Sequence, residues 1–221
     1  MSSGTGALVL AGGVGARALP RDKLLVAGPD GRTMIGRVTA ALAASRIDAV
    51  VIVTGHRPER IALACPGVAL VVAGDHREGM AASLRRGIEE AVRLGWDGAL
   101  VCLADMPLVT VATLDRLAGA LHPDGGRPDA VVPMAGGRRG NPVRWDRRMF
   151  PALLALRGDA GARSLLQGPG CDVLAIETGD RGVLEDFDDP ARLAWFESGC
   201  EPGLEPGSEP GSGPSLIGRG D

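Results

Sequence analysis

A glycine-rich segment and a single lysine follow the first apolar run of the chain. The segment Leu10–Arg17 reads LAGGVGAR, and Lys23 lies a few residues further on. Glycines directly after a buried strand let the backbone approach a ligand closely, with N–H groups free to bind phosphate oxygens. Arg17 and Lys23 add positive charge to the same loop. These residue types predict a site for a phosphorylated ligand; a tight glycine turn with solvated basic residues is the structural alternative.

Lys23 is the only lysine among 24 lysine and arginine residues, and Asn141 is the only asparagine. The composition favours residues with GC-rich codons, so we interpret the excess of arginine as a coding bias. A compact ammonium differs from a planar guanidinium in hydration and geometry. The retained lysine therefore suggests a position at which arginine does not suffice.

Two common nucleotide-binding motifs fit the glycine segment poorly. A Walker P-loop needs Gly-Lys-Ser/Thr before a helix, whereas Lys23 stands between an aspartate and a leucine. The range Gly13–Ala18 has the spacing of a dinucleotide fingerprint with a final alanine, but Pro20 follows and the next strong helix cap is Thr33. An NAD(P)H-dependent oxidoreductase is an alternative that would need a helix beginning at the glycines and an acid about 20 residues on.

Two acidic motifs could bind a metal ion. Asp105 lies in LADMP, directly after the apolar run Ala99–Ala104. A carboxylate there could hold Mg²⁺, which takes one or two carboxylates together with phosphate oxygens of a substrate. Asp188 lies in the later motif DFDDP. The structural alternatives are a loop aspartate before a proline turn and an aspartate that caps a helix.

Two further motifs could contact a ligand. In EGMAASLRRG, Gly79 and nearby amides precede a predicted helix, and Ser83 could bind a base or ribose or merely be solvated. In RGNPV, the amide of Asn141 can both donate and accept hydrogen bonds. Asn-Pro is also a common turn pair, so both interpretations of Asn141 stay open.

These motifs together resemble those of the MobA-like nucleotidyltransferases. That family includes the molybdenum cofactor guanylyl- and cytidylyltransferases, and its first loop wraps the triphosphate of an NTP. The resemblance implies that the nucleotide contacts Leu10, Ala11, Gly12, Gly13, Val14, Gly15, Gly79 and Ser83. The chain departs from the family at Ala18–Pro20, where Met-Gly or Phe-Gly is usual, which implies a stiffer loop.

The same resemblance implies roles for the charged residues. Lys23 and Arg17 would neutralise charge around the α-phosphate, and Asp105 would bind Mg²⁺, so these three are the expected catalytic residues. Asp188 would be a second metal ligand, since a late Asp-x-Asp element supplies one in the family. Asn141 would lie on the acceptor side.

The implied reaction transfers an NMP from an NTP to a phosphorylated acceptor such as the molybdopterin cofactor, with release of pyrophosphate. The LAGG motif resembles the guanylyl branch, whereas GMAASL and GNP resemble the cytidylyl branch, so we expect CTP, with GTP as the alternative. A molybdoenzyme or its chaperone is a candidate partner. A non-catalytic protein that delivers the cofactor is an alternative from a different class.

Short apolar runs alternate with amphipathic segments. The runs predict strands at Ala7–Ala11, Ala49–Val53, Val68–Ala73, Ala99–Ala104, Ala130–Met134 and Val173–Ile176. The amphipathic segments predict helices at Thr33–Ser45, Arg57–Ala64, Met80–Leu94, Thr110–Leu121, Arg147–Leu156 and Pro190–Glu197, with N-caps at Thr33, Thr110 and Asp146. This alternation predicts a three-layer, Rossmann-like α/β fold with a mainly parallel sheet and helices on both faces. The family resemblance makes the fold nucleotidyltransferase-like or GT-A-like.

Residues 1–199 are expected to form a single nucleotidyltransferase-like domain. Residues 200–221 repeat Glu-Pro-Gly without an apolar face, so we expect a disordered tail. This tail has four acids and one arginine, which accounts for the whole formal net charge of −3. The neutral remainder has few aromatic residues and no basic run, which argues against a nucleic-acid binder.

The cysteine and hydropathy patterns exclude further classes. The four cysteines are widely spaced without a CxxC pair, which argues against a zinc knuckle or a disulfide scaffold. No run approaches the roughly 18 apolar residues of a membrane span, and the first residues lack a secretion signal. We therefore expect a cytoplasmic protein that does not bind membranes.

Overall fold

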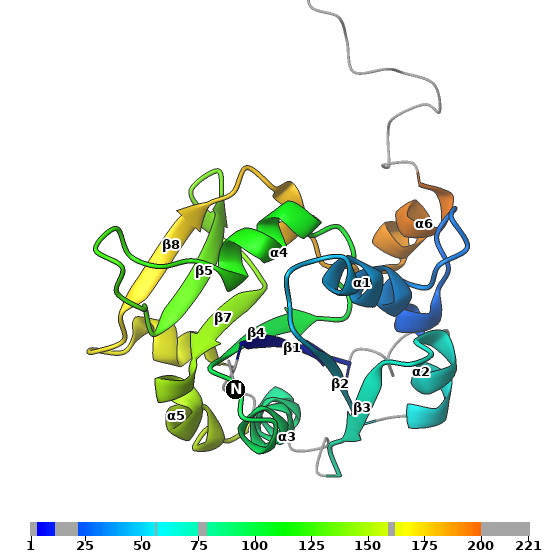
Figure 1. Ribbon diagram of the computed structural model, residues 1–221. Helices are drawn as coiled ribbons and strands as arrows, with labels where there is room; N and C mark the ends of the chain where they lie inside the picture. The colour runs from blue at the N-terminus through cyan, green and yellow to red at the C-terminus, as the bar shows by residue number, and fades with distance from the viewer. Residues whose placement is uncertain (1–3, 12–21, 56, 75–78, 159–161, 200–221) are drawn as a thin grey trace, which may run out of the picture.

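The computed structural model describes residues 4–11, 22–55, 57–74, 79–158 and 162–199 (Figure 1). Within these ranges one eight-stranded sheet has the order β3-β2-β1-β4-β7-β5-β6, and β8 pairs with β5. The strands are β1 (Thr5–Leu10), β2 (Val50–Thr54), β3 (Ala69–Val72), β4 (Gly98–Leu103), β5 (Ala130–Ala135), β6 (Arg138–Arg139), β7 (Val143–Asp146) and β8 (Val173–Glu177). The α-helices are α1 (Met34–Ala43), α2 (Pro58–Ala64), α3 (Met80–Arg93), α4 (Val111–Ala118), α5 (Phe150–Leu154) and α6 (Pro190–Ser198).

Two apolar cores lie on opposite faces of the sheet. Residues of α1, α2, α4 and α6 pack on one face, and residues of α3 and α5 pack on the other (Figure 1). In β1, Ala7 and Val9 belong to the first core and Leu8 to the second, and all three are fully buried. A strand buried on both faces has no polar positions, which explains its continuous apolar sequence. The predicted three-layer α/β fold is confirmed.

The sheet is mixed but mostly parallel. β1 pairs in parallel with β2 and β4, β2 with β3, and β5 with β8. All six predicted strands are present, and β6 and β7 were not predicted. β7 lies antiparallel between β4 and β5. Its sequence, VRWD, alternates apolar and charged residues, so it lacks the continuous apolar run that revealed the other strands.

Helix caps follow the predicted positions. Thr33 accepts a hydrogen bond from the Gly36 amide at 3.1 Å, and Thr110 accepts one from the Thr113 amide at 3.3 Å. Asp146 accepts from the Arg148 amide at 3.1 Å, but the turn that it caps is a 3₁₀ helix, η4 (Arg147–Met149). The helix predicted over Arg147–Leu156 was therefore too long, since its α-helical part is only α5.

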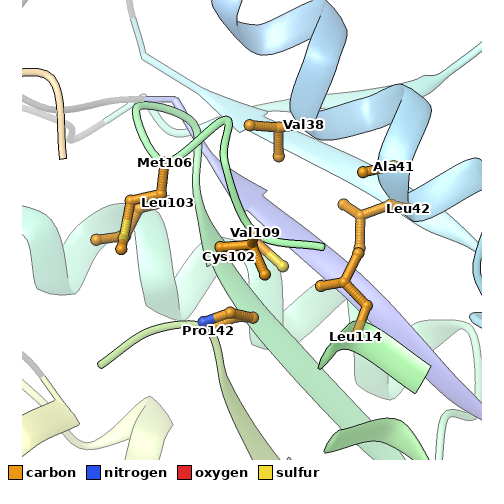
Figure 2. Close-up of a pocket in the computed structure, with 9 residues that line it drawn as sticks. All are labelled: Val38, Ala41, Leu42, Cys102, Leu103, Met106, Val109, Leu114 and Pro142. Carbon is orange, nitrogen blue, oxygen red and sulfur yellow. The ribbon is translucent and has the colours of Figure 1, made fainter. Parts of the chain in front are cut away.

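A small apolar cavity of about 20 Å³ lies under the loop that follows β4 (Figure 2). Its lining comes from α1, β4, α4, this loop and the segment before β7: Val38, Ala41, Leu42, Cys102, Leu103, Met106, Val109, Leu114 and Pro142. A cavity of this size has room for about one water, and its walls are mostly apolar. Burial raises the pKa of the Cys102 thiol, so this cysteine is an inert core residue.

Arg144 in β7 is a charged residue inside the first core. It is 2% exposed and lies in register with Leu100 and Val131, which belong to that core. No hydrogen-bond partner of its Nε or Nη2 atom is found among the described residues. Burial lowers the pKa of the guanidinium, and the charge of Asp146 opposes this only in part. Burying unsatisfied donors costs about 1–3 kcal/mol.

We expect Arg144→Met to raise the free energy of unfolding by about 1–3 kcal/mol, since a linear apolar side chain removes the unsatisfied donors. Urea denaturation measures the change. Arg46→Met, at a side chain that is 88% exposed, is the control and should change stability by less than about 0.5 kcal/mol. A lower stability of Arg144→Met would show that the guanidinium has a stabilising partner.

Candidate active site

Lys23 joins two aspartates from distant parts of the chain. Its Nζ atom donates to Asp105 Oδ2 at 2.6 Å and also to Asp188 Oδ1. Lys23 begins the 3₁₀ turn η2 (Lys23–Leu25), Asp105 follows β4, and Asp188 precedes α6. The residue is 6% exposed, so the ammonium is largely removed from water. The structure therefore brings together the predicted lysine and both predicted metal ligands.

Phe187 holds the two aspartates next to each other. Its backbone N–H donates to the carbonyl oxygen of Asp105 at 3.1 Å. Its ring is buried and lies 5.1 Å from the ring of Trp195 and 5.5 Å from that of Phe196, centroid to centroid. These aromatic contacts anchor the segment before α6, and they place Asp188 beside Asp105.

Asp189 makes the helix cap that the sequence left open for this motif. Its side chain accepts from the Arg192 amide at 2.9 Å, and Pro190 occupies the first turn of α6. A helix has one N-cap position. Asp188, whose side chain is 63% exposed, is thus left to pair with Lys23.

The site concentrates negative charge around one ammonium. Burial lowers the pKa of Lys23, but the charges and hydrogen bonds of Asp105 and Asp188 outweigh it, so the net pKa is raised. Burial also raises the pKa of Asp186, and repulsion from Asp188 and Asp105 adds to this. Such a cluster attracts a cation, including the metal ion of a metal–phosphate complex.

The donor set fits a hard divalent cation that shares its coordination with a substrate. The described residues contain no group of three His, Cys, Asp or Glu side chains that could hold a metal by themselves. Two carboxylates, Asp105 and Asp188, nevertheless converge on one cation, the Lys23 ammonium. Mg²⁺ commonly takes one or two carboxylates and completes its shell with water and phosphate oxygens.

Asp180 fixes the loops around this cluster, and the sequence did not reveal it. It accepts from the Thr110 amide at 2.9 Å, the Thr110 hydroxyl at 2.8 Å, the Thr113 hydroxyl at 2.7 Å and the Gly182 amide at 2.9 Å. The carboxylate thereby ties the start of α4 to the 3₁₀ turn η6 (Arg181–Leu184). A short acid-x-Gly turn was the only sequence signal for it.

Asn141 is positioned by close backbone packing. Its N–H donates to the Val183 carbonyl at 2.9 Å. A Cβ atom at Gly140 would lie 2.2 Å from the same oxygen, so glycine is required for this approach. Asn141 therefore lies in a turn and, at the same time, lines the cavity described next.

A cavity of about 330 Å³ opens between the sheet, α3 and the 3₁₀ turn η5 (Ala162–Gln167). Its floor consists of apolar side chains from four strands: Leu10, Val101, Leu103, Val132, Val143 and Trp145. Its sides are formed by Met80, Leu84, Ala162 and Leu166, and its polar lining by Arg139, Asn141, Arg163 and Gln167. Leu103, which lines the cavity, is two residues before Asp105 in the sequence.

The remaining predicted residues have different outcomes. Gly12, Gly13, Val14, Gly15 and Arg17 lie outside the described residues. The Ala11 amide donates to the Val53 carbonyl at 2.8 Å, which leaves it occupied by the sheet. Gly79 precedes α3 with a φ of 96°, and Ser83 is 3% exposed, so Ser83 is not a solvated helix residue. Of the cavity residues, sequence reasoning missed Trp145, Arg139, Arg163 and Gln167.

Comparison with known proteins now places the chain in a family. Residues 7–175 match the MobA-like NTP transferase domain. The chain belongs to this family. Lys23, Asp105 and Asn141 lie within the matched range of the MobA-like domain, whereas Asp188 lies beyond it. The pairing of Asp188 with Lys23 is therefore evidence that comes from the structure alone.

Two relatives of this MobA-like protein carry different names. The purine catabolism protein PucB of Bacillus subtilis is 33% identical over 122 residues, which are 55% of this chain and 57% of PucB. The phosphoenolpyruvate guanylyltransferase of Sphaerobacter thermophilus is 32% identical over 166 residues, 71% of this chain and 72% of that protein. The chain thus spans little more than half the length of PucB.

Solved structures share the fold. The Mycobacterium tuberculosis protein Rv0371c superimposes with a TM-score of 0.69 and 26% identity, over 80% of this chain and 89% of that chain. A further structure of Rv0371c, with a TM-score of 0.64, is a complex with manganese. In the part of this MobA-like chain that is described, no helix is long and apolar enough to cross a membrane.

We expect Asp180→Asn to lower the free energy of unfolding by about 2 kcal/mol, because an NH2 group replaces one carboxylate oxygen and faces N–H or O–H donors from which it cannot accept. Burial raises the pKa of Asp180, but its hydrogen bonds outweigh this and the net pKa is below the ordinary 3.8. The stabilisation is therefore complete above about pH 3.8 and is lost as the pH falls through the lower folded-state pKa. Denaturation at pH 7 and at decreasing pH measures both effects. A difference that persists unchanged in acid would contradict this role.

Proposed function

We propose that the protein transfers an NMP from an NTP to a phosphorylated acceptor such as the molybdopterin cofactor, with release of pyrophosphate. The observation that carries this proposal is the Lys23–Asp105–Asp188 cluster at the carboxyl ends of the parallel strands. Ligands of open α/β sheets bind at this edge. Membership of an NTP transferase family favours this activity over the oxidoreductase alternative.

The chemistry needs charge stabilisation more than proton transfer. An acceptor phosphate oxygen is already ionised at neutral pH, so it can attack the α-phosphorus in line without a strong base. Lys23 is placed to stabilise the charge that develops on the transferred phosphate and on pyrophosphate. Asp105 and Asp188 would hold Mg²⁺, which supplies a Lewis acid for the phosphate oxygens when bound. Arg17 and the glycines Gly12, Gly13 and Gly15 are proposed to bind the remaining phosphates.

The cavity of about 330 Å³ is the proposed acceptor site. Its walls are mostly apolar, which suits the flat ring system of a pterin better than the small, strongly acidic phosphoenolpyruvate. Arg139 and Arg163 can pair with anionic groups of the acceptor, and the amide of Asn141 can donate to it or accept from it.

The nucleotide base is proposed to bind near the start of α3, where Gly79 and Ser83 lie. The GMAASL and GNP motifs favour CTP. GTP stays the alternative, because a relative that is 32% identical is a guanylyltransferase.

A thermal-shift panel of CTP, GTP, ATP, NADH and NADPH, each with and without Mg²⁺, tests the nucleotide. Stabilisation by one NTP that depends on Mg²⁺ supports the transferase, and stabilisation by NADPH alone overturns it. Pyrophosphate release in the presence of molybdopterin then separates an enzyme from a protein that only delivers the cofactor.

We expect Lys23→Ala to lower turnover by at least about 100-fold, the scale for loss of one preorganised group that stabilises transition-state charge. Steady-state pyrophosphate release measures the effect. Arg46→Ala, at an exposed arginine far from the cluster in sequence, is the matched loss of one positive charge and should keep wild-type turnover. Near-normal turnover of Lys23→Ala would refute the assignment of this site.

We expect Leu166→Trp to raise the KM for the acceptor by about tenfold or more, since the larger ring enters the proposed acceptor cavity; tenfold corresponds to about 1.4 kcal/mol of binding. The KM for the NTP should stay unchanged. Leu63→Trp, at the most exposed leucine of the described residues, is the control. An increase in KM for the NTP instead would assign the cavity to the nucleotide.

A further inference from the structure

We propose that the Lys23 ammonium occupies the position of a divalent cation between Asp105 and Asp188, and that lysine and metal exchange there when a nucleotide binds. In the nucleotide-free protein the lysine and the metal would compete for the same two carboxylates. The identity of the group that receives the released lysine, an NTP phosphate, rests on the proposed function. The competition itself does not.

The geometry allows one cation between the two carboxylates at a time. Asp105 Oδ2 and Asp188 Oδ1 both contact the same Nζ atom. Mg²⁺ binds carboxylate oxygens at about 2.0–2.1 Å. A metal ion that contacted both of these oxygens would therefore overlap the ammonium, and two cations this close in a partly buried site repel each other strongly.

The Lys23 side chain cannot rotate into the solvent without losing favourable interactions. It is 8% exposed, and it makes a charge-assisted hydrogen bond to each aspartate. Leaving both would sacrifice two strong interactions of a largely buried charge. An anion that enters together with the metal provides a replacement partner, and the phosphates of a metal–nucleotide complex are such an anion.

The carboxylates, in turn, cannot be left without a cation. Asp105 Oδ2 and Asp188 Oδ1 lie close enough to contact one Nζ atom, so their negative charges repel each other when no cation lies between them. Phe187 and its aromatic contacts hold the segment in place, so the carboxylates cannot move apart easily. Departure of the ammonium and arrival of the metal are therefore coupled, and by linkage nucleotide and metal strengthen each other's binding.

The test measures binding of MnCl₂ to the full chain without nucleotide, from the EPR signal of free Mn²⁺. We expect weak binding by the wild type and binding at least about tenfold tighter by Lys23→Met and Lys23→Gln, because removal of a competing unit charge at this distance is a large electrostatic change. Lys23→Arg keeps the charge and should stay weak. Two neutral variants guard against the misfolding of one, and the Tm of each is measured first.

Two controls assign the signal to this site. Asp105→Asn should abolish the tight binding when it is combined with Lys23→Met. Arg60→Met removes a nearby charge that contacts Asp22 rather than the cluster, and it should change Mn²⁺ affinity less than about twofold. Equal Mn²⁺ affinity of the wild type and both neutral variants would overturn the competition.

A second arm repeats the titration with CTP and with GTP. The exchange predicts that nucleotide tightens Mn²⁺ binding to the wild type by a larger factor than to Lys23→Met, in which no lysine has to leave. An equal factor would overturn the exchange. Failure of the proposed function shows separately, as the absence of pyrophosphate release, so the two failures are distinguishable.

Discussion

The ion pairs of Lys23 with Asp105 and Asp188 join the segment after the glycine-rich sequence, the end of β4 and the approach to α6. A buried ammonium needs its partners, because an unpaired charge in this environment would be strongly destabilising. The surrounding structure accordingly holds each partner in place. Phe187 links its backbone to Asp105 and buries its ring, and Asp189 takes over the helix cap.

The two halves of the sheet contribute differently to the candidate site. The parallel half, β3-β2-β1-β4, ends its strands at one edge and so gathers the charged residues there. The antiparallel insertion of β7 between β4 and β5 places Val143 and Trp145 in the floor of the larger cavity. At the end of β4, Leu103 lines the cavity and Asp105, two residues later, binds Lys23.

The charged cluster and the cavity offer different chemistry. A lysine and a carboxylate at the edge of a parallel sheet suit any NTP, since phosphates are common to all of them. The proposed acceptor cavity has mostly apolar walls, with Arg139 and Arg163 in its lining. The chain's relatives include a purine catabolism protein and a phosphoenolpyruvate guanylyltransferase.

The sequence by itself determined the strands of the parallel half and the helix caps Thr33 and Thr110. It also singled out Lys23 as a candidate site residue. These features are local: apolar runs, capping side chains and a rare residue are visible without knowledge of distant contacts. It also singled out Asp105 and Asp188, although it left a helix cap as an equal alternative for the Asp188 motif. Arg17 and Gly12–Gly15 stay predictions, since they lie outside the described residues.

Only the tertiary structure decided the rest. The alternating sequence of β7 depends for its strand conformation on pairing with both β4 and β5. Asp180 acts through threonines about 70 residues away in the sequence, and the cavity lining comes from five strands and two helical segments. The choice between Asp188 and Asp189 required knowing which carboxylate the Arg192 amide reaches and which one lies next to Lys23. Such contacts join residues that are far apart in the sequence. They depend on how the segments pack in space, and the pattern of residues within any one segment does not reveal them.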